Sequence, residues 1–248
     1  MVNGLERFRA WFEGYADQFV LIGGTAASIA MEEAGQDFRR TKDLDVVLHL
    51  EALTPEFGKR FWAFVEAGGY EIRRSDATEK PKLYRFAKPQ EEDFPFMVEL
   101  FARAPTDIQL AAGSKLTPIP MDEAVSSLSA ILLDDIYYDF LMAGRRNLNG
   151  LPWVGEDRLI PLKAMAWLSL TKQKAAGEQV DSKNISKHLK DILLLAGLLS
   201  PTQTIFVHDK IASDLRRFID AVSAHEIEGK NLTVKLTFER LAAAYQLL

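Results

Sequence analysis

The chain has 248 residues, 48% of them hydrophobic and 26% charged, a composition typical of a globular protein that buries a core. Its 30 basic and 35 acidic side chains give a net charge of −5, which argues against a protein that coats nucleic acid but does not exclude a local patch that holds RNA. The chain has no cysteine, which excludes disulfides and thiolate metal sites.

Helical and strand-like patterns alternate over the first 156 residues. The expected elements are, in chain order, a helix over 4–16, a strand over 19–22, a helix over 25–34, a strand over 44–50, a helix over 55–68, strands around 70–74, 82–87 and 95–101, a strand over 129–133, a helix over 134–143 and a strand over 151–154. Gly35 is expected to end the second helix, and Thr54 followed by Pro55 is expected to cap and open the third.

From residue 157 onward the pattern is helical alone. Helices are expected over 160–175, 182–199, 209–224 and 235–248. We therefore predict an α/β (α+β) fold with two domains, 1–156 containing the sheet and 157–248 composed of helices. Nothing near residue 156 resembles a flexible linker, so this boundary rests on the change of pattern alone.

The beginning of the chain carries no targeting pattern. Residues 1–9 mix charged and aromatic side chains and lack the basic-then-apolar order of a signal peptide. The charge-free stretch 19–31 is shorter than the roughly 20 apolar residues that a membrane span needs. We therefore expect a soluble, cytoplasmic protein without a membrane segment.

Two aspartates one residue apart open the predicted strand 44–50. Side chains alternate along a strand, so Asp43 and Asp45 point to one side and Leu44 to the other. Like charges beside a buried strand repel, and a divalent cation removes that conflict. Mg²⁺ (or Mn²⁺) binds a carboxylate or two together with phosphate oxygens, which this pair and a nucleoside triphosphate would supply. The alternative is that one aspartate caps a turn and the other pairs with a neighbouring base: Arg39, Arg40 or Lys42.

A glycine pair joins the predicted strand 19–22 to the helix that follows. Without Cβ atoms, the backbone of Gly23 and Gly24 can approach a phosphate closely, and the helix N-terminus offers N–H donors. The hydroxyl of Thr25 could add a further hydrogen bond. The alternative is an ordinary tight turn.

Taken in order, the strand, the Gly-Gly-Thr turn, the helix and the segment Arg39-Arg40-Thr41-Lys42-Asp43-Leu44-Asp45 resemble the nucleotidyltransferase superfamily of the DNA polymerase β type. More narrowly, they resemble the AbiEii/MenT-type nucleotidyltransferase toxins of bacterial type IV toxin–antitoxin systems. In that family the Gly-Gly turn holds the triphosphate, and an Arg-x-Thr-x-Asp-(Leu/Ile)-Asp segment supplies metal ligands. Arg39, Thr41, Asp43 and Asp45 match this segment, and the resemblance implies a nucleotidyltransferase-type mixed sheet flanked by helices.

The superfamily usually adds a third carboxylate on a later strand, and Glu99 is the candidate here. It is the one charged residue of the predicted strand 95–101, and leaving a buried carboxylate unpaired would cost several kcal/mol. Binding the metal would satisfy it, and a role as an active-site base is equally compatible. The alternative is a salt bridge to Arg85 or Arg103.

The helical half adds a lysine that stands alone among apolar residues, Lys163 in the predicted helix 160–175. Either its stem carries the ammonium group to the surface, or the ammonium points into a polar site. The resemblance implies the second reading, because the family has a comparable lysine that reaches the nucleotide phosphates.

In the predicted helix 182–199, Lys183, Lys187 and Asp191 recur at four-residue spacing, apart from the apolar stripe. An ion pair with lysine before aspartate is the weaker helical orientation, so stability explains the pattern poorly. The resemblance implies that Lys187 and Asp191 reach the nucleotide, with His188 beside them. The lysine-rich stretch 172–190 is either a solvated face or a patch that attracts phosphates.

These residues predict transfer of a nucleoside monophosphate from a nucleoside triphosphate to an acceptor hydroxyl. Asp43 and Asp45 would bind the metal, Lys163 would stabilise the departing pyrophosphate, and Glu99 or Asp191 would orient or deprotonate the acceptor. By family analogy the acceptor could be a tRNA 3′ end, the chain a toxin and its partner an antitoxin protein. Two other hypotheses are a small-molecule (antibiotic-type) nucleotidyltransferase and a non-catalytic nucleotide-binding module. The nucleotide is expected to lie between the two halves.

Overall fold

A computed structural model of the chain describes residues 3–74, 81–103, 116–118, 129–224 and 231–247. They group into two compact units, the first comprising Met1–Ile29 and Asp37–Val154 and the second Ala30–Gln36 and Gly155–Leu248. The chain thus changes unit between residues 154 and 155, and the end of helix α2 groups with the second unit. The domains predicted over 1–156 and 157–248 stay a prediction.

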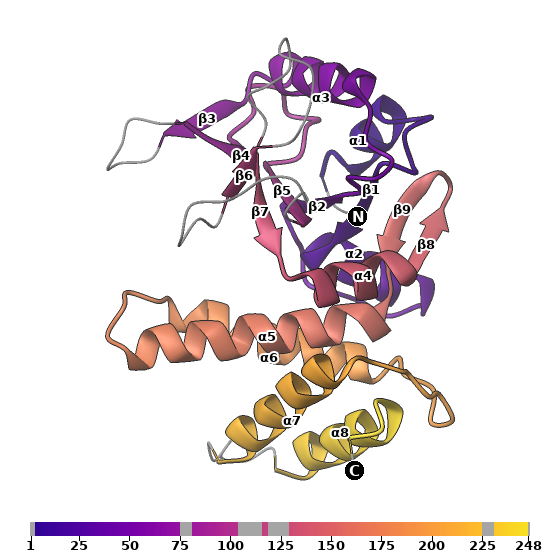
Figure 1. The fold of residues 1–248 in the computed structure, drawn as a ribbon, viewed down its shortest axis with the longest axis vertical. Helices are drawn as coiled ribbons and strands as arrows, with labels where there is room; N and C mark the ends of the chain where they lie inside the picture. Colours follow the sequence, from indigo (N-terminus) through magenta and orange to yellow (C-terminus); the bar gives the residue numbers. More distant parts are fainter. Residues whose placement is uncertain (1–2, 75–80, 104–115, 119–128, 225–230, 248) are drawn as a thin grey trace. The chain divides into compact units, whose positions relative to one another are not determined.

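A mixed β-sheet forms the centre of the first unit (Figure 1). Its described strands follow the order β3-β4-β5-β2-β1-β9-β8, and β7 pairs with both β5 and β6. The strands are β1 (Phe19–Ile22), β2 (Asp43–Leu48), β3 (Glu71–Arg74), β4 (Pro81–Ala87), β5 (Met97–Arg103), β6 (Leu116–Pro118), β7 (Ser129–Leu133), β8 (Arg145–Leu148) and β9 (Leu151–Val154). β1 is antiparallel to β2 and parallel to β9, and β2 is parallel to β5, so the predicted mixed α/β class is confirmed.

Aromatic packing holds two helices of this unit against β1. Its helices are α1 (Leu5–Trp11), α2 (Gly23–Glu33, shared with the second unit), α3 (Pro55–Ala67) and α4 (Asp135–Ala143). Phe8 of α1 lies 5.5 Å, between ring centroids, from both Phe19 of β1 and Phe64 of α3. All three rings are buried, and burying one such side chain stabilises the fold by roughly 1.5–3 kcal/mol. This cluster therefore anchors the strand that leads into Gly23-Gly24.

Two predicted helices have different boundaries in the structure. The first was expected over 4–16 but ends at Trp11, since Gly14 adopts a left-handed φ of 86° that a helix cannot continue. The second was expected from Thr25 but begins at Gly23, so the glycine pair forms its first turn.

Strands β6 and β8 were not predicted. The sequence of β8, Arg-Arg-Asn-Leu, has no apolar alternation to indicate a strand. The signal that could have found it is the Asn149-Gly150 dipeptide, whose φ angles of 52° and 85° form the two-residue turn of the β8–β9 hairpin.

The second unit contains long helices that pack on each other. They are α5 (Glu156–Ala175), α6 (Ser182–Ala196), α7 (Asp209–Ala224) and α8 (Asn231–Ala244). Phe218 of α7 packs edge-on against Trp167 of α5 at 5.3 Å and against Phe238 of α8 at 5.8 Å. Residue 248, the last of the predicted terminal helix, lies outside the described residues. Among the helices that the structure describes, none combines the length and apolar character needed to cross a bilayer.

The N-cap of α3 is confirmed and gives a test of local stability. The Thr54 hydroxyl oxygen accepts a hydrogen bond from the backbone N–H of Phe57 at 3.3 Å and itself bonds to the Gln18 side chain. Thr54→Ala should lower the free energy of unfolding by about 1 kcal/mol in urea titration, because this cap is lost. Thr54→Ser keeps the oxygen and should lose much less; equal losses in the two variants would contradict the capping role.

Candidate functional site

The turn between β1 and α2 lies directly against an aspartate of β2. Gly23 has a left-handed φ of 66°, and a Cβ atom placed on it would lie 1.7 Å from Oδ2 of Asp45. No other residue fits without displacing that carboxylate, because a real Cβ cannot approach an oxygen so closely. The first glycine therefore serves both the backbone turn and the position of Asp45.

The second glycine contacts the loop that leads into β2. A Cβ atom on Gly24 would lie 2.6 Å from Oγ1 of Thr41 and 3.6 Å from an Nη atom of Arg39. Thr25, fully buried, donates its hydroxyl to the main-chain oxygen of Asp43 at 2.9 Å. The structure thus brings the two predicted motifs together. We call Gly23, Gly24, Thr41, Asp43 and Asp45 the glycine–aspartate corner.

The two aspartates of the corner share one face of β2. Both are half-buried, whereas Leu44 between them is fully buried on the opposite side. Within the described residues, the Asp43 carboxylate forms no ion pair with a neighbouring base, and Lys42 instead lies over the ring of Phe96 at 5.6 Å. For Asp43, the structure does not contain the ion pair that would explain its place without a ligand.

Glu99 of β5 lies beside Asp45 in the parallel pairing of β5 with β2. On the other side, Arg85 of β4 is in register with Glu99, and its Nε donates to Oε1 of Glu99 at 2.5 Å. This is the salt bridge named above as the alternative for Glu99. Arg103, the other arginine considered, pairs with Glu51. The role of Glu99 as metal ligand or base stays a prediction.

The carboxylates of the corner suit a hard divalent cation. In the part of the chain that the structure describes, no group of three His, Cys, Asp or Glu side chains is arranged to hold a metal ion by itself. Mg²⁺ is commonly held by one or two carboxylates, with substrate phosphates and water completing its six ligands. The donor set of Asp43 and Asp45 therefore fits an ion that arrives with a triphosphate better than a permanent structural metal.

In the second unit, the structure brings together two other predicted residues. The ammonium group of Lys163 in α5 donates to Oδ2 of Asp191 in α6 at 2.8 Å. The two side chains are 6% and 1% exposed, which excludes the alternative that the lysine stem leads to the surface. Sequence reasoning picked both residues but missed their pairing. The available signal was two lone charges, each on a largely apolar helix.

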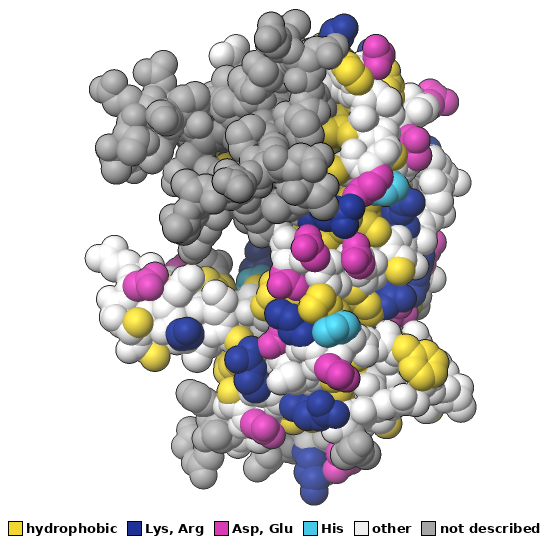
Figure 2. Space-filling model, viewed as in Figure 1, with side chains coloured by type: hydrophobic (Ala, Val, Ile, Leu, Met, Phe, Trp, Pro, Cys, Tyr) yellow, Lys and Arg dark blue, Asp and Glu magenta, His cyan; other side chains and the backbone are white. Residues whose placement is uncertain are grey.

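The remaining predicted residues of α6 lie nearer to solvent. Lys187 and His188 are half-buried and Lys183 is exposed. The lysine-rich stretch is exposed in large part, and Lys174 donates to the Ser182 hydroxyl at 2.7 Å. On the face drawn in Figure 2, basic and acidic side chains are interspersed on the described surface. A phosphate-attracting role for residues 172–190 stays a prediction.

Comparison with known proteins gives one structural similarity to report. No protein-family model matches the chain, and no curated protein does. The fold is similar to the crystal structure of an antigenic nucleotidyltransferase-like protein from Paracoccidioides brasiliensis, with a TM-score of 0.46 and 13% sequence identity over 93% of each chain. A similarity of this size does not define the function of the chain.

The close contact at Gly23 can be tested against a matched glycine. Gly35 has the same φ of 66°, but a Cβ atom there would meet nothing within 4 Å. Gly35→Ala should cost roughly 1 kcal/mol of stability from backbone strain alone. Gly23→Ala should cost roughly 1–3 kcal/mol more in the same urea titration, because its Cβ displaces Asp45. Equal losses would show that the contact with Asp45 is unimportant.

The buried ion pair predicts strong coupling between two substitutions. Lys163→Met or Asp191→Leu alone should cost about 3–5 kcal/mol, because each leaves a buried charge without its partner. The double variant should cost clearly less than the sum of the two, as measured by a double-mutant cycle in urea. Lys235→Met, which removes one partner of an exposed pair with Glu239, is the control and should have little effect. Additive losses would contradict the coupling.

Proposed function

We propose that this chain is a Mg²⁺-dependent nucleotidyltransferase that moves a nucleoside monophosphate from a nucleoside triphosphate to an acceptor hydroxyl. The observation that carries the proposal is the glycine–aspartate corner: Gly23 lies against Asp45, and Gly24 lies against Thr41. A helix N-terminus, which favours anions, thus lies beside two carboxylates that suit a cation. A triphosphate with its metal ion has both kinds of charge.

In the proposed reaction, the acceptor hydroxyl oxygen attacks the α-phosphorus of the nucleotide. A new P–O bond forms, the bond from the α-phosphorus to the oxygen that bridges to the β-phosphorus breaks, and pyrophosphate leaves with that electron pair. The hydroxyl proton passes to a carboxylate or to water. Catalysis of this kind depends on positioning and charge stabilisation rather than on a covalent intermediate.

The corner supplies these functions from one strand and one turn. Asp43 and Asp45 would hold Mg²⁺ (or Mn²⁺), which when bound neutralises phosphate charge as pyrophosphate departs. The guanidinium group of Arg39 and the hydroxyl of Thr41 lie against Gly24, where they would bind triphosphate oxygens beside the turn. Thr25 is engaged with the backbone of Asp43, so we assign it to holding the corner together.

The residues of the helical unit enter the proposal through the family resemblance. There, Lys163, Lys187 and Asp191 would contribute to phosphate binding and to orienting the acceptor. The pairing of Lys163 with Asp191 supports a joint role, since removing either partner leaves the other charge buried. On the same basis we propose a tRNA 3′ end as the acceptor and a toxin whose partner is an antitoxin protein.

The donor side is tested by incubating the protein with each α-³²P-labelled nucleoside triphosphate, Mg²⁺ and total tRNA. We expect transfer of label that depends on Mg²⁺ and falls at least about 100-fold in Asp43→Ala and Asp45→Ala, as when a preorganised charge-stabilising group is lost. Glu66→Ala, which removes an exposed acid of α3, is the control and should keep full activity. Thermal unfolding of each variant checks the fold.

The same assay separates the remaining hypotheses. Label on RNA supports the tRNA acceptor, and label on an added aminoglycoside supports the small-molecule alternative. If the protein binds nucleotide equally well in Asp43→Ala and Asp45→Ala and transfers nothing, the enzyme proposal is wrong and a binding module remains.

A further inference from the structure

The sheet of the first unit ends at β8, away from the glycine–aspartate corner in strand order. β8 pairs with β9 on one side, and within the described residues no strand pairs with its other side. We call that outer side of Arg145–Leu148 the β8 edge. An open strand edge offers backbone N–H and C=O groups to a further strand.

The hairpin register shows which groups face outward. Asn149 and Gly150 form a two-residue turn, so Leu148 and Leu151 next to it exchange backbone hydrogen bonds. Bonded and non-bonded pairs alternate in an antiparallel ladder, which places Arg145 and Asn147 at non-bonded positions. Their N–H and C=O groups therefore point away from β9, at the two-residue spacing that an added strand needs.

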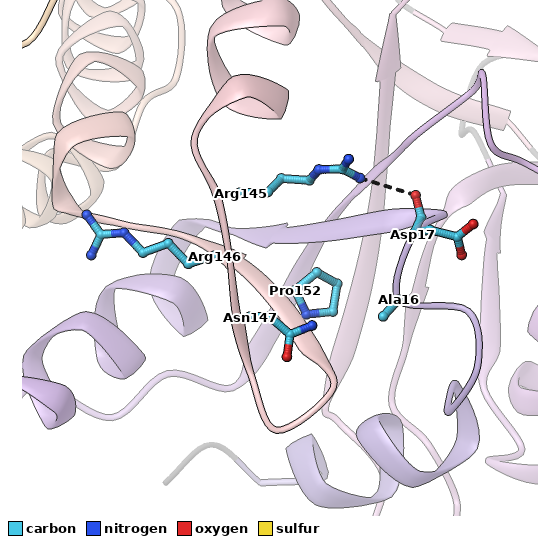
Figure 3. A pocket seen from close by; sticks show the side chains of 6 residues that line it. All are labelled: Ala16, Asp17, Arg145, Arg146, Asn147 and Pro152. Carbon is cyan, nitrogen blue, oxygen red and sulfur yellow. Dashed lines mark hydrogen bonds between the residues drawn. The ribbon is translucent and has the colours of Figure 1, made fainter.

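A surface cavity of about 310 Å³ lies beside this edge (Figure 3). It is lined by Ala16, Asp17, Arg145, Arg146, Asn147 and Pro152. Arg145 extends across to the main-chain oxygen of Asp17, to which its Nη1 donates at 3.2 Å, while Arg146 points in the opposite direction. An added strand would thus place alternate side chains over the cavity face and over the Arg146 face.

The charge of the edge decides what can occupy it. Arg145, Arg146 and Asn147 are all exposed, and Arg146 lies over the buried ring of Trp153 at 5.3 Å. Among the described residues Arg145 forms no ion pair with Asp17, so its charge is not neutralised there. A second copy of β8 would bring arginines against arginines, which is destabilising. An acidic segment would instead pair with one arginine on each face.

We propose that the β8 edge binds an extended acidic segment of another protein, which joins the sheet as an additional strand. Main-chain hydrogen bonds to Arg145 and Asn147 supply the register, and adjacent acids of the segment pair with Arg145 and Arg146. This surface is independent of the proposed catalytic residues, so binding does not depend on the nucleotidyltransferase activity.

The test uses three fluorescent hexapeptides and the full chain. The acidic probe is Thr-Val-Glu-Glu-Val-Thr, the charge control is Thr-Val-Lys-Lys-Val-Thr, and the third is the acidic probe with every amide N-methylated. By fluorescence anisotropy the acidic probe should bind at least about fivefold more tightly than the lysine probe. The N-methylated probe should lose binding, because it cannot donate to the strand edge.

Variants and hydrogen exchange identify the surface. Arg145→Gln/Arg146→Gln should weaken the acidic probe at least about fivefold, whereas Lys59→Gln/Lys235→Gln removes the same charge elsewhere and should not. The amide protons of Arg145 and Asn147 should become protected when the acidic probe is added. Equal binding of the acidic and lysine probes, or unchanged exchange of those amides, would overturn the proposal, and so would absence of binding.

Discussion

The arrangement of the first unit depends on the contact between the backbone of Gly23 and the carboxylate of Asp45. The contact needs a residue that has no Cβ and that tolerates a left-handed φ, and glycine alone meets both conditions. It joins the end of β1 to the start of β2, two strands that are antiparallel neighbours in the sheet. Ile22, next to Gly23, is in register with Asp45, so the sheet itself brings the turn to the carboxylate.

The rest of the sheet supports this contact from both sides. Arg85, Glu99 and Asp45 lie in register on three adjacent strands, so one positive and two negative charges follow each other across the sheet. Pairing Glu99 with Arg85 offsets the repulsion between the two neighbouring acids. On the other face of β2, Leu44 and Val46 are fully buried. Charges on one face and a packed core on the other hold the strand in one register.

Much of the fold could be predicted because its sequence signals are local. The β1 strand, the Thr54 cap and α7 follow from apolar spacing and capping residues within a few positions. β8 could not be found by that route, since Arg145, Arg146 and Asn147 carry no alternating apolar pattern and the strand exists through its hairpin with β9. A strand defined by its partner is visible only once the pairing is known.

The candidate site could be predicted as a set of residues, but its contacts could not. Residue order identified Gly23, Gly24, Asp43 and Asp45, because a glycine turn and an acid pair each have a chemical meaning at short range. The salt bridge that holds Glu99 depends on which strands lie side by side, and Arg85 and Arg103 are equally plausible from sequence. The structure decides for Arg85 through the antiparallel pairing of β4 with β5.

The buried pair of Lys163 and Asp191 also has a consequence for how α5 and α6 can slide along each other. Their apolar side chains would tolerate a shift of one helical turn, about 5.4 Å, with little change in buried area. The charges would not, because such a shift would part an ammonium and a carboxylate that lie 2.8 Å apart and are shielded from water. Two ionised groups thereby select one alignment out of several that hydrophobic packing alone would leave nearly equal in energy.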